Sequence, residues 1–490
     1  MMKIPVLSLI IFLPAIGAAI LPFLRSDNKV RWVALAFAVA DFLLATWLLF
    51  NFDTTTYAMQ FRETVSWVPS LGISYALGID GISVLFVFLT ALLGWICVLA
   101  SWRAITRRVA QFMISLLVMQ ALMLGVFCAL DLFLFYFFWE AMLIPMYLII
   151  GVWGGDNRVY AAFKFFLYTL VGSVLFLVGI LVLYFHGGET FDILVLMDGD
   201  YSFIVQAWVF LAFLVAFAVK VPMVPVHTWL PDAHVEAPTA GSIVLAGVLL
   251  KMGAYGFLRF SLPMLPEASQ YFALPVLALS VIAIVYGGFL ALAQDDLKKL
   301  VAYSSVSHMG FVTLGLFALN SRGLEGSILQ MFNHGITTGA LFLFVGLIYE
   351  RTHTRRIGDY GGLMKVAPVY GVLLAVFTLS SLAVPGTNAF IGELLILTGA
   401  FATNMMIGAI AVTGAVLSAA YLLGMFRKVA LGPPVYEKGE AMWDMNGREL
   451  VAAIPLAVFV FWVGFYPQPF LDVMHVSVEH LLEQVQGTYR

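Results

Sequence analysis

Four charged residues stand inside long apolar stretches of the chain. Glu140 follows a run of leucine, phenylalanine and tryptophan, Lys220 ends an uninterrupted apolar run that begins at Ala207, and Lys251 and Glu393 are flanked by apolar residues on both sides. An isolated charge in hydrocarbon costs at least ~2.5–3.5 kcal/mol, so such residues are kept where they pair or do chemistry. A single buried lysine could have a purely structural role, as half of an ion pair that fixes helix packing. Four buried charges instead favour a functional set of residues, here called the row.

Two histidines fit the same row. His308 and His334 each lie 13 residues from Ser321, where a turn is expected, so they should meet at one depth on neighbouring helices. Burial favours neutral lysine and a nearby carboxylate favours charged lysine, so a Glu–Lys pair that separates and re-forms can release and rebind a proton. Histidine relays protons at ordinary pH. The pattern therefore predicts proton translocation by six residues: Glu140, Lys220, Lys251, Glu393, His308 and His334.

A polar segment from residue 227 to residue 238 holds three further candidates, His227, Asp232 and His234. Pro231 and Pro238 predict a non-helical loop, placed at the inner mouth between two helices. Its composition resembles a metal cluster, but the H-E-x-x-H spacing of a zinc helix is absent. We interpret it as a proton-entry loop, with a metal site as the alternative.

Composition makes the bilayer the solvent for most of these elements. Hydrophobic residues make up 62% of the 490 residues and charged residues 11%, and low-charge runs reach 18 residues or more, enough to span hydrocarbon. The net charge of −3 argues against nucleic-acid binding. Cys97 and Cys128 lie in separate apolar runs and are predicted to be buried thiols rather than a disulfide or redox pair. The sequence has no C-x-x-C cluster motif and no glycine-rich dinucleotide fingerprint, which predicts no redox cofactor and no metal on this chain.

Apolar periodicity predicts an all-α polytopic protein with about fourteen transmembrane helices. They are expected near residues 4–24, 31–50, 80–101, 110–128, 131–152, 162–186, 204–235, 239–260, 272–293, 300–319, 325–349, 367–402, 405–430 and 450–468. The long loop at 51–79 is a candidate for short strands. The tail at 469–490 is predicted to be a helix whose apolar face packs against neighbouring subunits.

Orientation follows from the distribution of basic residues. The first apolar segment resembles a signal peptide, but only Lys3 precedes it and a second apolar run follows closely, which favours an uncleaved helix. Of the 25 Lys and Arg residues, 18 fall in loops that would share one side and five on the other, while two lie within helices. Basic loops stay cytoplasmic, so the pattern predicts a multi-pass protein of the bacterial inner membrane with both termini in the periplasm.

Two of the predicted helices contain breaks. The helix at 204–235 contains Pro222 and Pro225, and the helix at 367–402 contains Pro385-Gly386. Each is the fourth member of a five-helix block, and broken helices in matching positions suggest two inverted repeats of transporter type. The predicted units are N-terminal helices 1–3 with the outer loop at 1–109, a first repeat at 110–260, a second repeat at 270–430, and helix 14 with the tail at 431–490.

The residues around these breaks resemble a known family. The stretch from Lys220 to Ser242, with Leu245–Gly253, resembles the signature of antiporter-like subunits, which occur in respiratory complex I, in Mrp-type Na⁺/H⁺ antiporters and in membrane-bound hydrogenases. Phe138-Trp139-Glu140, Ala302–Gly310 and Phe332–Gly335 are similar to further motifs of this family. The family usually has lysine where this chain has Glu393, and glutamate there is typical of the subunit M branch of complex I, equivalent to the fourth mitochondrially encoded subunit.

The resemblance implies roles for the row. Glu140 and Lys220 would form a gating ion pair, Lys251 the central relay continued by His308 and His334, and Glu393 the terminal site of a second half-channel. The chain would be a proton-translocating subunit of NADH:quinone oxidoreductase, beside other membrane-arm subunits that include two further antiporter-like ones. NADH, FMN, iron–sulfur clusters and quinone would belong to partner subunits. The alternatives are a subunit of an Mrp-type antiporter and a membrane scaffold that transports nothing.

Overall fold

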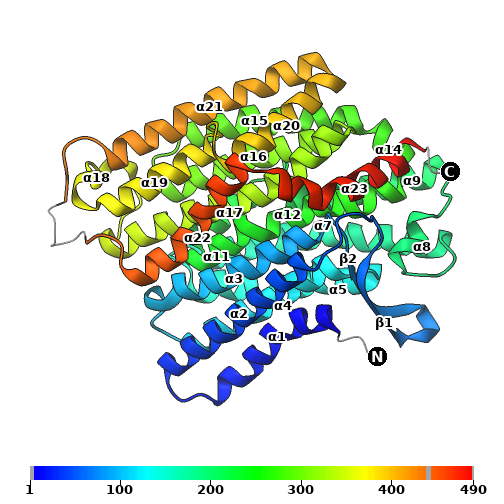
Figure 1. Ribbon diagram of the computed structural model, residues 1–490, viewed down its shortest axis with the longest axis horizontal. Helices are drawn as coiled ribbons and strands as arrows, with labels where there is room; N and C mark the ends of the chain where they lie inside the picture. The colour runs from blue at the N-terminus through cyan, green and yellow to red at the C-terminus, as the bar shows by residue number, and fades with distance from the viewer. Residues whose placement is uncertain (1–4, 437–442, 488–490) are drawn as a thin grey trace.

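The computed structural model describes residues 5–436 and 443–487. Within these residues, thirteen helices are long and apolar enough to cross a membrane, and two shorter apolar helices, α19 (Pro368–Ser381) and α20 (Asn388–Thr403), follow each other in the chain. Together α19 and α20 form the predicted crossing at 367–402, interrupted where Pro385-Gly386 was expected to break it. With the thirteen long helices this gives the predicted count of about fourteen crossings. The all-α class is confirmed, and Figure 1 shows the helices packed in one bundle.

The long helices follow the predicted spans to within a few residues at most ends. They are α1 (Val6–Ile20), α2 (Asp27–Phe50), α3 (Val84–Ala104), α4 (Val109–Cys128), α5 and α6 (Leu132–Ala141 and Leu143–Trp153), α7 (Arg158–His186), α9 (Phe203–Lys220), α15 (Ala273–Leu292), α16 (Leu297–Phe317), α17 (Ser321–Thr352), α21 (Met405–Ala430) and α22 (Gly447–Phe465).

Short elements connect these spans. The long outer loop forms an antiparallel hairpin of β1 (Gln60–Val68) and β2 (Ile73–Ile79), as its composition suggested. The remaining short helices are α8 (Ile193–Met197), α10 (Trp229–Glu236), α14 (Pro266–Tyr271) and α18 (Leu363–Val366), with single 3₁₀ turns at Leu21–Phe23, Pro69–Leu71 and Ile357–Asp359. The 19-residue helix α23 (Gln468–Gln486) follows the last span.

One span is irregular along its whole length. It starts as α11 (Thr239–Val244), passes through a π turn η3 (Leu245–Leu249), continues as α12 (Leu250–Gly256), and ends through a second π turn η4 (Phe257–Ser261) and α13 (Leu262–Met264). π turns inside α-helices concentrate at functional positions. Lys251 lies between the two π turns, in a span that is buried throughout.

The predicted loop at 227–238 is wrong in its secondary structure. Residues 227–228 and 237–238 are non-helical, but Trp229–Glu236 between them forms α10. Pro231 does not prevent this because it lies in the first turn of the helix, where its missing amide hydrogen would have no partner within the helix.

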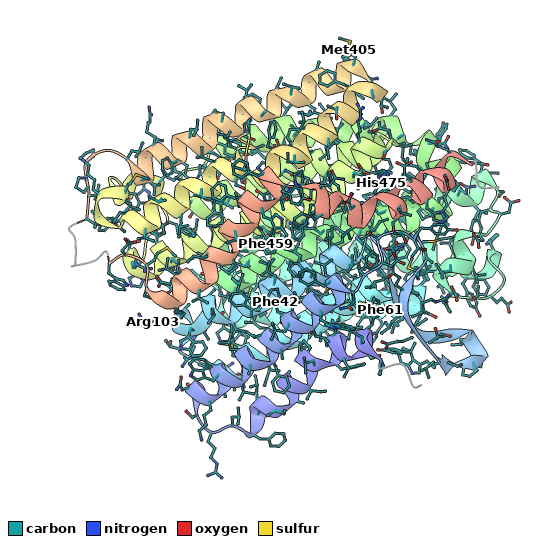
Figure 2. All side chains as sticks on the ribbon, viewed as in Figure 1. Phe42, Phe61, Arg103, Met405, Phe459 and His475 are labelled. Carbon is teal, nitrogen blue, oxygen red and sulfur yellow. The ribbon has the colours of Figure 1, made fainter. Side chains whose placement is uncertain are left out.

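The predicted partner of the tail also needs correction. The apolar side chains of α23, among them Phe470, Met474 and Leu481, are buried against this chain's own α13, α14 and α17 rather than left free for a neighbouring subunit. In Figure 2, Phe459 and His475 mark α22 and α23 along one face of the bundle. Phe459 lies 5.9 Å from Phe332 of α17 between ring centroids, so aromatic packing joins these elements.

The first and last helices place both ends of the described chain on one side of the bundle. The start of α1 and the end of α23 lie toward the end of the bundle that carries the hairpin (Figure 1). A chain that crosses the membrane an even number of times must begin and end on the same side. Cys97 and Cys128 are both free and buried, as predicted.

Candidate functional site

The central lysine contacts a histidine directly. Lys251 on α12 is fully buried, and its Nζ lies 2.6 Å from Nδ1 of His334 on α17. Nζ also donates to the carbonyl oxygen of Ala246, in the π turn that precedes it. The π turn changes the local hydrogen-bond pattern at the point where the lysine side chain folds back, so backbone and imidazole together hold the amine.

From His334 the polar row continues to α20. The rings of His334 and His308 lie 5.8 Å apart between centroids, which is the predicted meeting of α16 and α17 at one level. His308 Nδ1 lies 3.2 Å from Oε1 of Glu393, and the same oxygen accepts from Gln330 Nε2 at 3.2 Å. Four of the predicted residues therefore form a buried row from α12 to α20.

Glu140 and Lys220 do not form the predicted direct ion pair. They lie within electrostatic range of each other, but among the described residues Lys220 Nζ has no hydrogen-bond partner and no carboxylate within 4 Å. The amine instead lies over the indole ring of Trp139, 4.7 Å from its centroid. Trp139 Nε1 donates to Ser173 Oγ at 3.0 Å, and Ser173 also faces Glu140. A π face is a favourable place for an ammonium without a carboxylate.

The break after Lys220 is satisfied by nearby donors. Lys220 is the last residue of α9, where the negative end of the helix dipole favours a cation. Trp229 Nε1 donates to the carbonyl of Val219 at 2.9 Å. Gly253 of α12 makes room for this helix end, because a Cβ there would lie 2.9 Å from the carbonyl oxygen of Phe217 and 3.0 Å from the Cβ of Lys220. The break can therefore abut the helix that carries Lys251.

The break between α19 and α20 is satisfied by polar side chains. Asn388 Oδ1 accepts from Ser380 Oγ at 2.6 Å, and its backbone carbonyl accepts from Asn333 Nδ2 at 2.7 Å. Ser380 Oγ also lies 2.6 Å from Thr337 Oγ1. An amide and hydroxyl network thus replaces the helical hydrogen bonds lost at the break.

The three polar candidates of the 227–238 segment do not converge. Asp232 pairs with Lys164 of α7 at 2.7 Å, and His227 is oriented toward the ring of Tyr286 at 5.8 Å between centroids. His234 is fully buried, and its ring stacks on Phe342 at 4.4 Å between centroids. No metal set forms from these three side chains.

His234 is close to two buried lysines, one of which lines an open cavity. It is within electrostatic range of both Lys251 and Lys298. Lys298 Nζ donates to the carbonyl of Ala237 and lines a cavity of about 480 Å³ at the end of the bundle away from the hairpin. Glu236, Glu350 and several arginines also line this cavity, so it is polar enough to hold water.

Several residues of the site carried no signal that singled them out. Trp139 belongs to a motif that resembles the family, but no role could be assigned to it from the sequence. Nothing in the sequence distinguishes three further residues from other helix residues: Ser173, Gln330 and Lys298. A polar residue on the inward face of an apolar helix is the one pattern that could have found Ser173 and Gln330. Lys298 was counted as a loop charge, although it is buried.

Comparisons with known proteins agree with this geometry. The family model of the NADH:quinone oxidoreductase/Mrp antiporter membrane region matches residues 129–418. The chain is 49% identical to NADH-quinone oxidoreductase subunit M of Rhodobacter capsulatus, over 97% of this chain and 96% of that one, and 47% identical to NADH-ubiquinone oxidoreductase chain 4 of Arabidopsis thaliana, over 97% of each.

Solved structures give the same result. A chain of respiratory complex I from Thermus thermophilus superposes with a TM-score of 0.90 at 33% identity, over 98% of this chain and 99% of that one. A chain of the Mrp complex from Dietzia superposes with a TM-score of 0.87 at 22% identity, over 99% of each, which shows a shared fold. The chain therefore belongs to the NADH:quinone oxidoreductase/Mrp antiporter membrane family, in its subunit M and chain 4 branch.

Proposed function

We propose that this chain translocates protons in the membrane arm of an NADH:quinone oxidoreductase. The observation that carries the proposal is the buried row Lys251–His334–His308–Glu393, in which direct contacts join Lys251 to His334 and His308 to Glu393. Ionisable side chains are costly inside a membrane, and where they occur they usually mark a path for protons or ions. The full-length relatives at 43–49% identity are complex I subunits, which favours this reading over an Mrp-type antiporter.

The row would work as a relay in its present geometry. A proton on Lys251 can pass to His334 along a 2.6 Å contact. The step between the histidines needs a ring rotation or a bridging water, since their centroids are 5.8 Å apart. Glu393 then accepts the proton from His308, and Gln330 keeps the carboxylate oriented.

Glu140 and Lys220 would set the direction. A carboxylate close to an ammonium favours the charged form, and its withdrawal favours release. In the observed state Lys220 lies on Trp139 rather than on Glu140. We propose that this is the open state of the gate, and that movement of Lys220 toward Glu140 closes it. Lys251 lies on the helix that contacts Lys220 at Gly253, so a change in the charge or position of Lys220 would alter the proton affinity of Lys251.

The cavity beside Lys298 is the entrance that fits this scheme. Lys298 lines this cavity, and His234 is within electrostatic range of both Lys298 and Lys251. His227 and Asp232 would act at the surface of the same side, where Asp232 is partly exposed and bound to Lys164. The five-helix blocks at 110–260 and 270–430 would each supply one half of the path.

Partners would supply the energy. We propose that NADH, FMN, iron–sulfur clusters and quinone bind other subunits, and that this chain sits beside other membrane-arm subunits. Residues 103, 351 and 355, all arginine, line the entrance cavity, as the positive-inside rule expects of the cytoplasmic side. Both termini would then face the periplasm.

Orientation can be tested with single cysteines, because the two natural ones are buried. Gly358 is exposed and an added Cβ there meets nothing within 4 Å, while Ser202 is exposed at the start of α9. Gly358→Cys should react with an impermeant maleimide only from the cytoplasm, and Ser202→Cys only from the periplasm. The reverse pattern would refute the orientation.

The function is tested at Lys251. Lys251→Met removes the charge at similar length and should lower proton pumping in membrane vesicles by about a hundred-fold or more, because a positioned proton-transfer group contributes that much. Lys299→Met, at an exposed lysine of α16, is the matched control and should pump normally. If an assembled complex with Lys251→Met pumps at the parental rate, the relay is wrong and a scaffold role is favoured.

A further inference from the structure

A cluster of three side chains joins α23 to α17 on the side of the molecule that carries the hairpin. Glu325 lies one turn into α17, and His475 and Glu479 lie one turn apart on α23. The three ligand atoms, one from each side chain, lie within 4.8 Å of one another. None of these residues belongs to the proton row.

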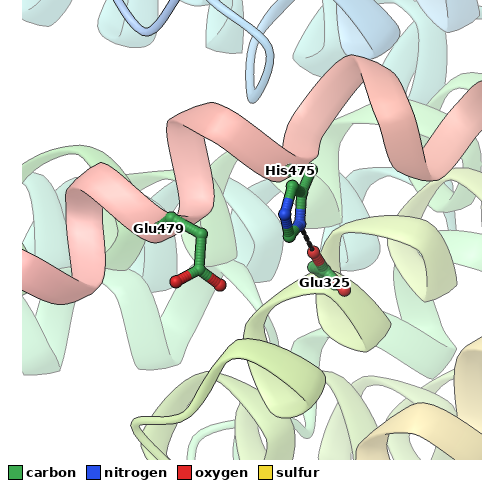
Figure 3. A group of neighbouring side chains, drawn as sticks. All are labelled: Glu325, His475 and Glu479. Atoms are coloured by element: carbon green, nitrogen blue, oxygen red, sulfur yellow. Dashed lines mark hydrogen bonds and ion pairs between the residues drawn. The ribbon is translucent and has the colours of Figure 1, made fainter.

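The geometry brings both helices to one point. His475 Nδ1 lies 2.6 Å from Glu325 Oε1 (Figure 3). The i, i+4 spacing of His475 and Glu479 places both on one face of α23, which is the face turned toward Glu325. Ser321 Oγ donates to Glu479 Oε1 at 2.5 Å, so a neighbouring hydroxyl already orients the third carboxylate.

The donor set selects a class of ion. One imidazole nitrogen and two carboxylate oxygens are ligand atoms that Zn²⁺ accepts, and a site with three protein ligands leaves a fourth position for water. Mg²⁺ and Ca²⁺ prefer all-oxygen coordination and gain little from the histidine. Zinc binds its nitrogen and oxygen ligands at ~2.0–2.2 Å, so the atoms must close in slightly. His475 and Glu479 can rotate to do this because both are exposed.

We propose that Glu325, His475 and Glu479 form a binding site for a divalent transition-metal ion of the Zn²⁺ type. The bound ion fixes α23 to the first turns of α17. Glu325 precedes His334 of the relay by nine residues on the same helix, ~13.5 Å along its axis. The site therefore reinforces a helix that the proton row uses, without contacting the row.

The test measures Zn²⁺ binding to the membrane complex that contains the chain, purified with chelator and then dialysed against micromolar Zn²⁺. The wild-type complex should retain one more zinc ion than complexes with His475→Gln or Glu479→Gln. The affinity of that ion should fall by about ten-fold or more in each variant, since even loss of a group that only orients a ligand costs ~10–100-fold. His186→Gln, at an exposed histidine at the end of α7, is the matched control and should leave binding unchanged.

Two further readouts make the result decisive. Co²⁺ in place of Zn²⁺ should give the visible absorption of a low-coordinate site in the wild type and lose it in His475→Gln. Zn²⁺ should raise the unfolding temperature of the wild-type complex but not that of His475→Gln, which also shows that the variant is folded. Equal zinc retention by wild type and His475→Gln would overturn the proposal. Displacement of Zn²⁺ by equimolar Ca²⁺ would overturn the assignment to a transition metal.

Discussion

The two five-helix blocks hold their buried charges in different ways. In the second block Glu393 is bound by His308 and Gln330, both at 3.2 Å, and Asn388 satisfies the break with a side-chain network. In the first block Lys220 has no hydrogen-bond partner in the described chain and lies over Trp139, and Glu140 retains an unbonded carboxylate oxygen. The Glu393 carboxylate is held by hydrogen-bond donors, whereas the Lys220 ammonium has no hydrogen-bond acceptor among the described residues.

The difference indicates which half is poised to move. A buried charge with donors at hydrogen-bond distance is in a local minimum, whereas a buried ammonium without a partner is costly and sensitive to any approaching carboxylate. We infer that the first block holds the switch formed by Glu140 and Lys220, and that the conduction row runs from Lys251 of the first block into the second block.

The largest expected effect is at Glu140. Glu140→Gln removes the carboxylate that acts electrostatically on Lys220, so Lys220 can no longer alternate between a charged and a neutral partner. We expect quinone reduction and pumping in vesicles to fall by about a hundred-fold. Glu393→Gln keeps hydrogen bonds to Gln330 and His308. It should therefore lose pumping but lower the thermal stability less than Glu140→Gln does.

Glu140→Asp is the matched control for charge. It keeps the carboxylate at a shorter reach and should retain part of the activity. Assembly is checked on a native gel in each case. If Glu140→Gln pumps normally while Glu393→Gln does not, the switch lies elsewhere and the contrast between the blocks is structural.

A second comparison concerns the ion pairs at opposite ends of the blocks. Asp80, in the turn before α3, binds Arg259 of the first block at 2.6 Å, and Arg351 of the second block binds Glu449 at 2.7 Å. Burial alone would raise the pKa of Asp80, but the charge and hydrogen bonds of Arg259 outweigh it and hold that pKa below its usual range. Asp80→Asn leaves Arg259 buried without its partner and should lower the free energy of unfolding by about 3–5 kcal/mol.

The sign of the pH effect follows from the lowered pKa. The stability that Asp80 contributes is fully present above its unfolded pKa of ~3.9 and is lost as the pH falls through the lower folded value. Thermal unfolding in detergent at pH 7 and at about pH 3 should show the gap between wild type and Asp80→Asn narrowing in acid. Asp156→Asn, at an exposed position between α6 and α7, should change neither the unfolding temperature nor its pH dependence appreciably.

The sequence was sufficient for the spans and for most of the row, for a physical reason. Hydrocarbon forces long apolar runs and penalises every charge within them, so Lys251 and Glu393 stand out without any knowledge of the fold. The depth argument placed His308 and His334 together because helices rise by a fixed step per residue. The argument from proline failed at 227–238, because the first turn of α10 accommodates Pro231.

The contacts between individual side chains could not be predicted from the sequence. The position of Lys220 depends on rotamers and on the packing of three helices, and no spacing rule distinguishes a carboxylate partner from a ring partner. The destination of α23 was missed because an amphipathic helix covers an apolar surface of its own chain as readily as that of a neighbour. The cluster on α17 and α23 was invisible because its members lie 150 residues apart in sequence.

The smallest expected effect is at Trp139, the residue on which the contrast between the blocks depends. A cation–π contact is worth ~0.5–2 kcal/mol, so Trp139→Leu should shift the proton equilibrium of Lys220 by roughly 2- to 30-fold rather than abolish transport. Loss of the π face disfavours the charged lysine, so the pH profile of pumping should move to lower pH. Trp139→Phe keeps a ring but loses the hydrogen bond to Ser173, and should move the profile less. Trp208→Leu, at an exposed residue of the same α9 that ends in Lys220, should leave the profile in place. An unchanged profile in Trp139→Leu would mean that the ring is only packing, and that Lys220 is held by Glu140 in the working enzyme.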